Sequence, residues 1–95
     1  MGMKDTYEQR LQAKLEEWDA EIAKLKVKAG EVEAAAQTQY KQELEDLQER
    51  RKELEAKLEE LRQSGEGAWE DIKAGIELSK DSLDQAIRSA RARFQ

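Results

Sequence analysis

Basic side chains near the C-terminal end are the first group whose types and spacing could do chemistry. Arg88, Arg91 and Arg93 precede Phe94, and together they could form a basic amphipathic tail for anionic lipid or phosphate. The same bases would also complement the negative end of a helix dipole, because the acids of this segment lie early and its bases late. We favour the second, structural interpretation.

A second basic run is Arg50-Arg51-Lys52, in which Arg51 falls on the apolar seam described below. Its aliphatic stem could be buried while the guanidinium pairs with an acid of a partner helix and sets the register. A side chain that simply reaches solvent fits the pattern equally well. Lys24, Lys26 and Lys28 alternate at spacing two, so they share no helical face and predict only a solvated surface.

Two tryptophans and two acid pairs complete the candidate sites. Trp18 and Trp69 could bind a ligand, but both lie on the apolar stripe, which favours core packing. The pairs Glu16-Glu17 and Glu59-Glu60 lack the loop geometry of a Ca²⁺ or Mg²⁺ site. We therefore expect no metal and no cofactor.

The composition narrows the function further. The 95 residues include no His, Cys or Pro, so disulfides, thiolate nucleophiles, imidazole catalysis and the usual zinc ligands are excluded. A net charge of −5 argues against nucleic acid as the main partner. No apolar run is long enough for a transmembrane helix, and the first residues resemble no signal segment. We expect a cytoplasmic protein that is not an enzyme.

The same composition indicates helices. Ala, Glu, Lys, Leu and Arg make up about 59% of the chain, which is typical of coiled coils. Asp5-Thr6-Tyr7-Glu8 predicts a capped helix start, and the helix then runs without a proline to about residue 63. A glycine turn follows at 64–67, where Gly65 can adopt a left-handed conformation, and a second helix covers about 68–94. Gly30 is the one plausible further break, and a turn there would give a three-helix monomer.

Apolar residues recur along both helices at alternating steps of three and four, as in a heptad seam. Steps of four from Val32 to Leu44 amount to stutters, which locally unwind a coiled coil. This seam is the predicted core and dimer interface: Leu11, Leu15, Trp18, Ile22, Leu25, Val32, Ala36, Tyr40, Leu44, Leu47, Leu54, Leu58, Leu61, Trp69, Ile72, Ile76, Leu83, Ile87 and Phe94.

The two predicted helices differ in length, and this difference predicts a partner. A helix over 5–63 would be roughly 88 Å long and the second roughly 40 Å, so a hairpin leaves the seam of residues 7–32 uncovered. An antiparallel two-fold homodimer would cover it, with the long helices crossing near Ala34-Ala35-Ala36. We therefore predict an all-α fold, a single helical domain over 1–95 whose antiparallel coiled-coil hairpin assembles as an elongated helical-bundle dimer.

Two motifs that centre on tryptophan carry a family resemblance. Residues 15–25 and 64–75, together with Tyr40, Leu44, Leu47 and the basic end 89–94, resemble a family of small bacterial coiled-coil proteins. The resemblance covers nearly the whole chain. It implies an association with bacterial stress response and offers no catalytic residues, and the biochemical role of the family is poorly defined.

Three functions are consistent with these observations. The leading hypothesis is a non-enzymatic structural or interaction protein that acts as a homo-oligomeric helical bundle. The alternative is an amphipathic protein that binds a lipid or hydrophobic surface, similar in pattern to apolipoproteins or granule-coating proteins. A disordered protectant that folds on binding is the third. An enzyme comes last, because a thin helical assembly rarely has a pocket.

Overall fold

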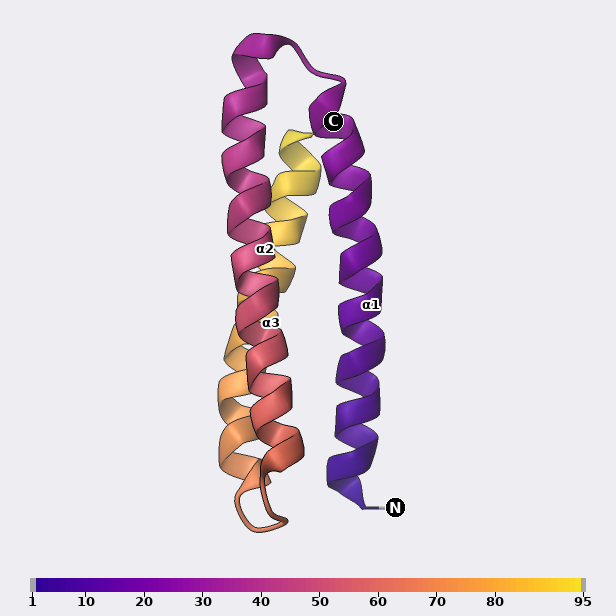
Figure 1. Cartoon of the computed structure of the whole chain (residues 1–95), viewed down its shortest axis with the longest axis vertical. Coiled ribbons are helices and arrows are strands. Elements are labelled where there is room, and N and C mark those ends of the chain that lie inside the picture. Colours follow the sequence, from indigo (N-terminus) through magenta and orange to yellow (C-terminus); the bar gives the residue numbers. More distant parts are fainter. Residues whose placement is uncertain (1, 95) are drawn as a thin grey trace.

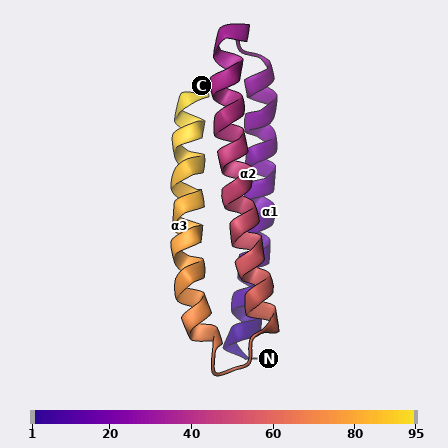
Figure 2. The ribbon, with the colours of Figure 1, turned by 60° about the vertical axis from the view of Figure 1, so that its left-hand side comes forward.

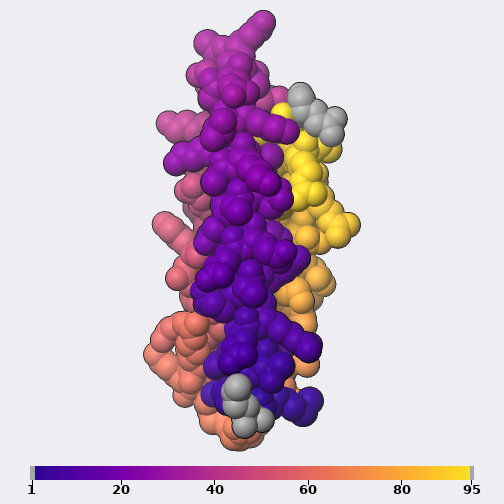
Figure 3. Space-filling model, turned by 90° about the vertical axis from the view of Figure 1, so that its right-hand side faces the viewer, coloured from indigo at the N-terminus to yellow at the C-terminus, as the bar shows by residue number. Residues whose placement is uncertain are grey.

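The fold is all-helical. A computed structural model describes residues 2–94, in which three helices follow one another: α1 (Met3–Gly30), α2 (Ala34–Gln63) and α3 (Trp69–Arg93). Successive helices run in opposite directions and form an elongated bundle of 51 × 18 × 18 Å (Figures 1 and 2). In the space-filling view α1 lies along both α2 and α3 (Figure 3).

The predicted continuous helix over 5–63 is wrong, because the chain turns between Gly30 and Ala34. Glu31 ends α1 in a nearly helical conformation (φ −94°, ψ −8°), and Glu33 is extended (φ −61°, ψ 150°) before α2 begins. The turn lets α1 fold back on α2, so that its apolar stripe is buried within the chain. Burying large apolar side chains outweighs the few helical hydrogen bonds lost at the turn. The three helices agree with the alternative prediction, in which the chain breaks near Gly30.

Both predicted helix-end signals are also wrong in detail. α1 begins at Met3, and no side chain caps it, so Asp5 lies in the first turn as a favourable charge. No described residue has a positive φ, Gly65 included. Instead Ser64 leaves the helix in an extended conformation (φ −79°, ψ 153°), and its Oγ donates a 2.7 Å hydrogen bond to the Leu61 carbonyl. α3 begins at Trp69, one residue after the expected start.

The core follows the seam, and it forms inside one chain. Trp18 and Trp69 are both buried, as expected of core residues. The seam positions Val32, Ala36, Tyr40 and Ile72 are only partly buried. The remaining predicted seam residues are all buried: Leu11, Leu15, Ile22, Leu25, Leu44, Leu47, Leu54, Leu58, Leu61, Ile76, Leu83, Ile87 and Phe94. Because the stripe of α1 is covered by α2 and α3, the mismatch in length from which the dimer was predicted is absent.

An aromatic contact closes the bundle where α3 ends. Tyr40 and Phe94 stack with ring centroids 4.1 Å apart and an angle of 21° between the rings. The Tyr40 hydroxyl also donates a 2.8 Å hydrogen bond to the Arg93 carbonyl, one of the carbonyls that a helix end leaves unpaired. The turn between α1 and α2 extends beyond this point, so α3 covers only part of the α1–α2 pair (Figure 1).

The core predicts a large difference between two leucines. Leu58 is 1% exposed and Leu78 is 74% exposed. Leu58→Ala should lower the free energy of unfolding by about 2–5 kcal/mol, because it leaves a cavity between the helices. Leu78→Ala is the matched control and should change that free energy by less than about 0.5 kcal/mol. Urea unfolding followed by circular dichroism measures both, and equal losses would contradict this core.

Candidate functional site

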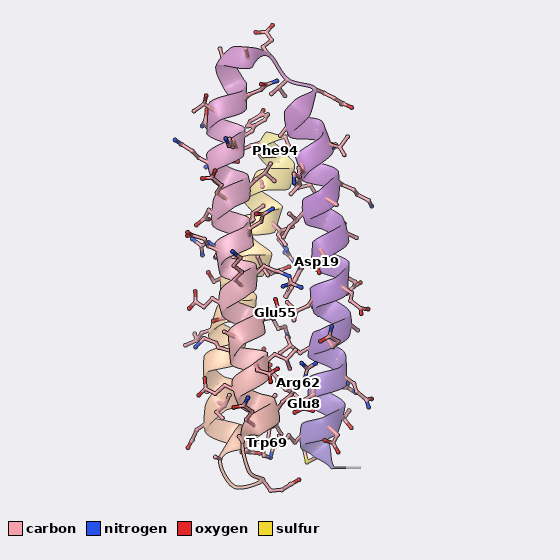
Figure 4. All side chains as sticks on the ribbon, in the orientation of Figure 1. Glu8, Asp19, Glu55, Arg62, Trp69 and Phe94 are labelled. Atoms are coloured by element: carbon pink, nitrogen blue, oxygen red, sulfur yellow. The ribbon has the colours of Figure 1, made fainter. Side chains whose placement is uncertain are left out.

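Arg51 forms the best-defined polar contact between helices. Its Nε and Nη2 donate to the two carboxylate oxygens of Asp19 on α1, at 2.7 and 2.9 Å. Glu55, one turn further along α2, forms a second ion pair with the same guanidinium, and Figure 4 shows Asp19 and Glu55 between α1 and α2. The hydrogen bond to Asp19 raises the pKa of Arg51 above its ordinary value. A bidentate pair is directional, so it favours one alignment of α1 on α2.

The C-terminal bases also contact acids of the bundle. Arg91 lies 3.0 Å from Glu21 on α1, and Arg93 pairs with Glu43 on α2. Arg88 pairs within α3, with its Nε 3.2 Å from Asp84. Arg91 and Arg93 also lie in the last turn of α3, where positive charge complements the helix dipole, as the structural interpretation expects.

The acid pairs and the alternating lysines are not brought together into a site. Glu16, Glu17, Glu59 and Glu60 are exposed, and residues 2–94 contain no group of three or more side chains suited to hold a metal ion. Residues 24, 26 and 28 all lie exposed on α1, as expected for a solvated surface. None of the helices in the described chain is long and apolar enough to cross a membrane.

A groove between α1 and α3 is lined by four basic side chains. It has a volume of about 370 Å³ and lies between Arg10 and Lys14 on α1 and Lys73 and Lys80 on α3. Spacings of four and seven put each pair on one face of its helix. Tyr7, Leu11 and Glu77 complete its lining. Four bases and one acid therefore face this basic groove, in a chain whose net charge is −5.

Two aromatic rings lie beneath the Lys73 ammonium in the basic groove. Its Nζ is 5.2 Å from the ring centre of Tyr7 and 5.5 Å from that of Trp69, within the range of cation–π attraction. The two rings are themselves 6.2 Å apart. The rings attract the cation but do not neutralise its charge, so Lys73 stays available to an anion.

The acids near the groove leave two of its bases unpaired. Lys14 lies 3.5 Å from Glu17 and Lys80 lies 3.2 Å from Glu77, each three residues away on its own helix. Arg10 and Lys73 form no ion pair with any described residue. The groove therefore presents positive charge without an acidic partner at Arg10 on α1 and at Lys73 on α3.

The hydroxyl of Tyr7 is buried at the groove and has no hydrogen-bond partner within residues 2–94. Burial, which is the larger cause, and the nearby carboxylate of Glu77, which opposes a second negative charge, together raise the pKa of Tyr7 to about 12. The phenol therefore stays neutral and keeps its proton as a possible donor to a ligand. An unpaired buried hydroxyl costs folding free energy, which a ligand acceptor would recover.

Sequence reasoning missed the basic groove. The signal was present in the spacing of Arg10 with Lys14 and of Lys73 with Lys80, beside Tyr7 and Trp69. A continuous first helix left no reason to bring residues 7–14 beside residues 69–80 of the same chain. Only the turn at residues 31–33 places them together.

No family model, no curated protein and no solved structure matches the chain.

The raised pKa of Tyr7 predicts a late titration. In a Tyr40→Phe variant, ultraviolet absorbance should show the remaining tyrosine ionising near pH 12 in the folded chain. The unfolded tyrosine ionises near pH 10, so Tyr7 contributes stability below pH 10 that is lost as the pH rises through 12. Adding Glu77→Gln should lower the pKa only part of the way, because burial is the larger cause. Ionisation near pH 10 in the folded Tyr40→Phe chain would contradict the buried hydroxyl.

Proposed function

We propose that this chain is a non-enzymatic coiled-coil interaction protein, cytoplasmic and connected with stress, which forms homo-oligomers by exchanging α1 between copies. In the exchanged dimer, α1 of one chain would lie on α2 and α3 of the other. The observation that carries this proposal is the turn at residues 31–33. All of its residues are of types that a helix can also accommodate.

The backbone of the turn demands no special residue. None of its residues has a positive φ, and it contains no proline. A side chain at Gly30 would meet no atom within 4 Å, so glycine is not needed there for close approach. Apart from the N–H bonds that begin α2, Gln37 steadies the turn by donating to the Val32 carbonyl at 3.1 Å. Straightening the turn therefore breaks few contacts and adds helical hydrogen bonds in their place.

The surface that α1 buries is the same in both forms. Its buried residues face α2 and α3, and a second copy offers identical helices: Leu11, Leu15, Trp18, Ile22, Leu25 and Ala29. Exchange of an identical element keeps every such contact and is a low-cost route to dimers. The exchanged pair is the antiparallel dimer that the seam predicted, with the long helices crossing near residues 34–36. The concentration of the protein then determines the proportions of closed monomer and exchanged dimer.

A proline in the turn tests this proposal. Glu33 has φ −61°, which proline also adopts, and its amide donates no hydrogen bond within the described chain. Glu33→Pro should leave the closed monomer folded, but it costs the straightened helix about 3 kcal/mol per chain. We expect the dimer dissociation constant to rise more than a hundredfold, measured by light scattering on a sizing column across a range of concentrations.

Glu33→Ala is the matched control, because it removes the same side chain and leaves the backbone free to become helical. It should dimerise at least as well as the unaltered chain. A strictly monomeric unaltered chain at every concentration would overturn the exchange. Equal dimerisation of the proline and alanine variants would overturn it as well, because the turn would then play no part.

A further inference from the structure

We propose that the basic groove between α1 and α3 binds a small amphiphilic anion, a carboxylate or phosphate head that carries a short apolar tail. The head would lie between Arg10 and Lys73, and the tail would lie against the rings of Tyr7 and Trp69. This ligand site is independent of the proposed exchange of α1, because an exchanged α1 would rebuild the same groove on the other chain.

The charge around the groove selects an anion. Arg10 reaches it from α1 and Lys73 from α3, and neither has an acidic partner among the described residues. Lys14 and Lys80 add charge from the same two faces, although each already contacts one acid. A head between Arg10 and Lys73 would accept charge-assisted hydrogen bonds from both helices at once, and such bonds are stronger than those between neutral groups.

The tail is indicated by a second hollow that continues the basic groove. This hollow has a volume of about 360 Å³, and it shares Tyr7, Arg10 and Lys73 with the first. Its further wall is made by Met3, Thr6 and Trp69, with Gly2 at the edge. Met3 is 74% exposed there, which is a large apolar side chain left in water beside an indole ring. A short alkyl chain would cover both.

The order of the two hollows determines the shape of the ligand. Lys14 and Lys80 line only the first hollow, whereas Met3 and Trp69 line only the second. Trp69 lies at the end of the bundle where the chain passes from α2 to α3 (Figure 4). Tyr7 lines both hollows, and its unpaired hydroxyl could donate to the head. A free inorganic anion would use only the charged half, and an uncharged alkyl chain would use only the apolar half. The two halves are satisfied together by a molecule that is anionic at one end only.

Sodium octanoate is the probe for this site, at concentrations below those at which it forms micelles. In ¹H–¹⁵N spectra of the unaltered chain, the Trp69 indole signal and the amide signals of residues 7–14 and 73–80 should move, while those of residues 34–39 should not. Inorganic phosphate and n-octanol should each produce weaker binding than octanoate, because each supplies only half of the ligand.

Variants that each remove one positive charge test where the anionic head of the ligand binds. Arg10→Gln and Lys73→Gln should each weaken octanoate binding about tenfold or more, the fold-change that about 1.4 kcal/mol represents. Lys24→Gln and Lys26→Gln are the matched controls, since they remove one exposed base each from α1 outside the groove, and they should bind as the unaltered chain does.

Several results would overturn the site. One is a set of octanoate shifts spread evenly over the helices, and another is equal affinity for n-octanol. Equal loss of binding in Lys73→Gln and Lys24→Gln would show only a general effect of charge. If the chain co-sediments with anionic phosphatidylglycerol vesicles but shows no response to octanoate, the anion-binding groove is refuted and the chain instead binds a lipid surface. Octanoate binding by a strictly monomeric chain would support the site and leave only the exchange of α1 refuted.

Discussion

The bundle depends on the burial of one apolar stripe, the inner face of α1. Leu11, Leu15 and Trp18 are almost fully enclosed by α2 and α3, although Leu, Ile, Val and Phe together make up less than a fifth of the chain. With so few of them, the chain cannot leave this stripe in water and remain folded. The turn, the ion pairs across the helices and the basic groove all exist because α1 lies in this place.

The helical class and the positions of the core could be predicted from the sequence, because heptad spacing and burial follow the same period. The break at residues 31–33 could not. Glu31-Val32-Glu33 has no proline, and Gly30 alone costs only about 1 kcal/mol in a helix. Local propensity therefore favours a straight helix there, and it is overridden by contacts between residues far apart in the sequence.

The polar contacts also differ in whether they follow from local sequence spacing or from contacts between residues far apart in the sequence. The position of Arg51 on the seam was compatible with a pairing to an acid across helices and equally with a side chain that reaches solvent, whereas the pairing with Asp19 depends on the register of α1 against α2. The basic groove depends wholly on contacts between distant residues, since within one chain both turns must form before Arg10 and Lys73 can line the same groove. A continuous helix over residues 5–63 and two helices joined by a turn share the same local sequence pattern. Within one chain, only the two joined helices make this groove.

The most direct measurement is the distance, within one chain, between a position near the start of α1 and the end of α2. The chain has no cysteine, so spin labels at Gln9→Cys and Gln63→Cys are specific, and dilution with unlabelled protein restricts the signal to single chains. In the bundle these positions share one end, where Lys4 Nζ donates to the Ser64 carbonyl at 2.6 Å. We predict a short distance in dilute solution, about 10 Å between helix axes plus the label arms. At a dilution where the chain is monomeric, a distance of roughly 80 Å, that of a continuous helix, would contradict the fold.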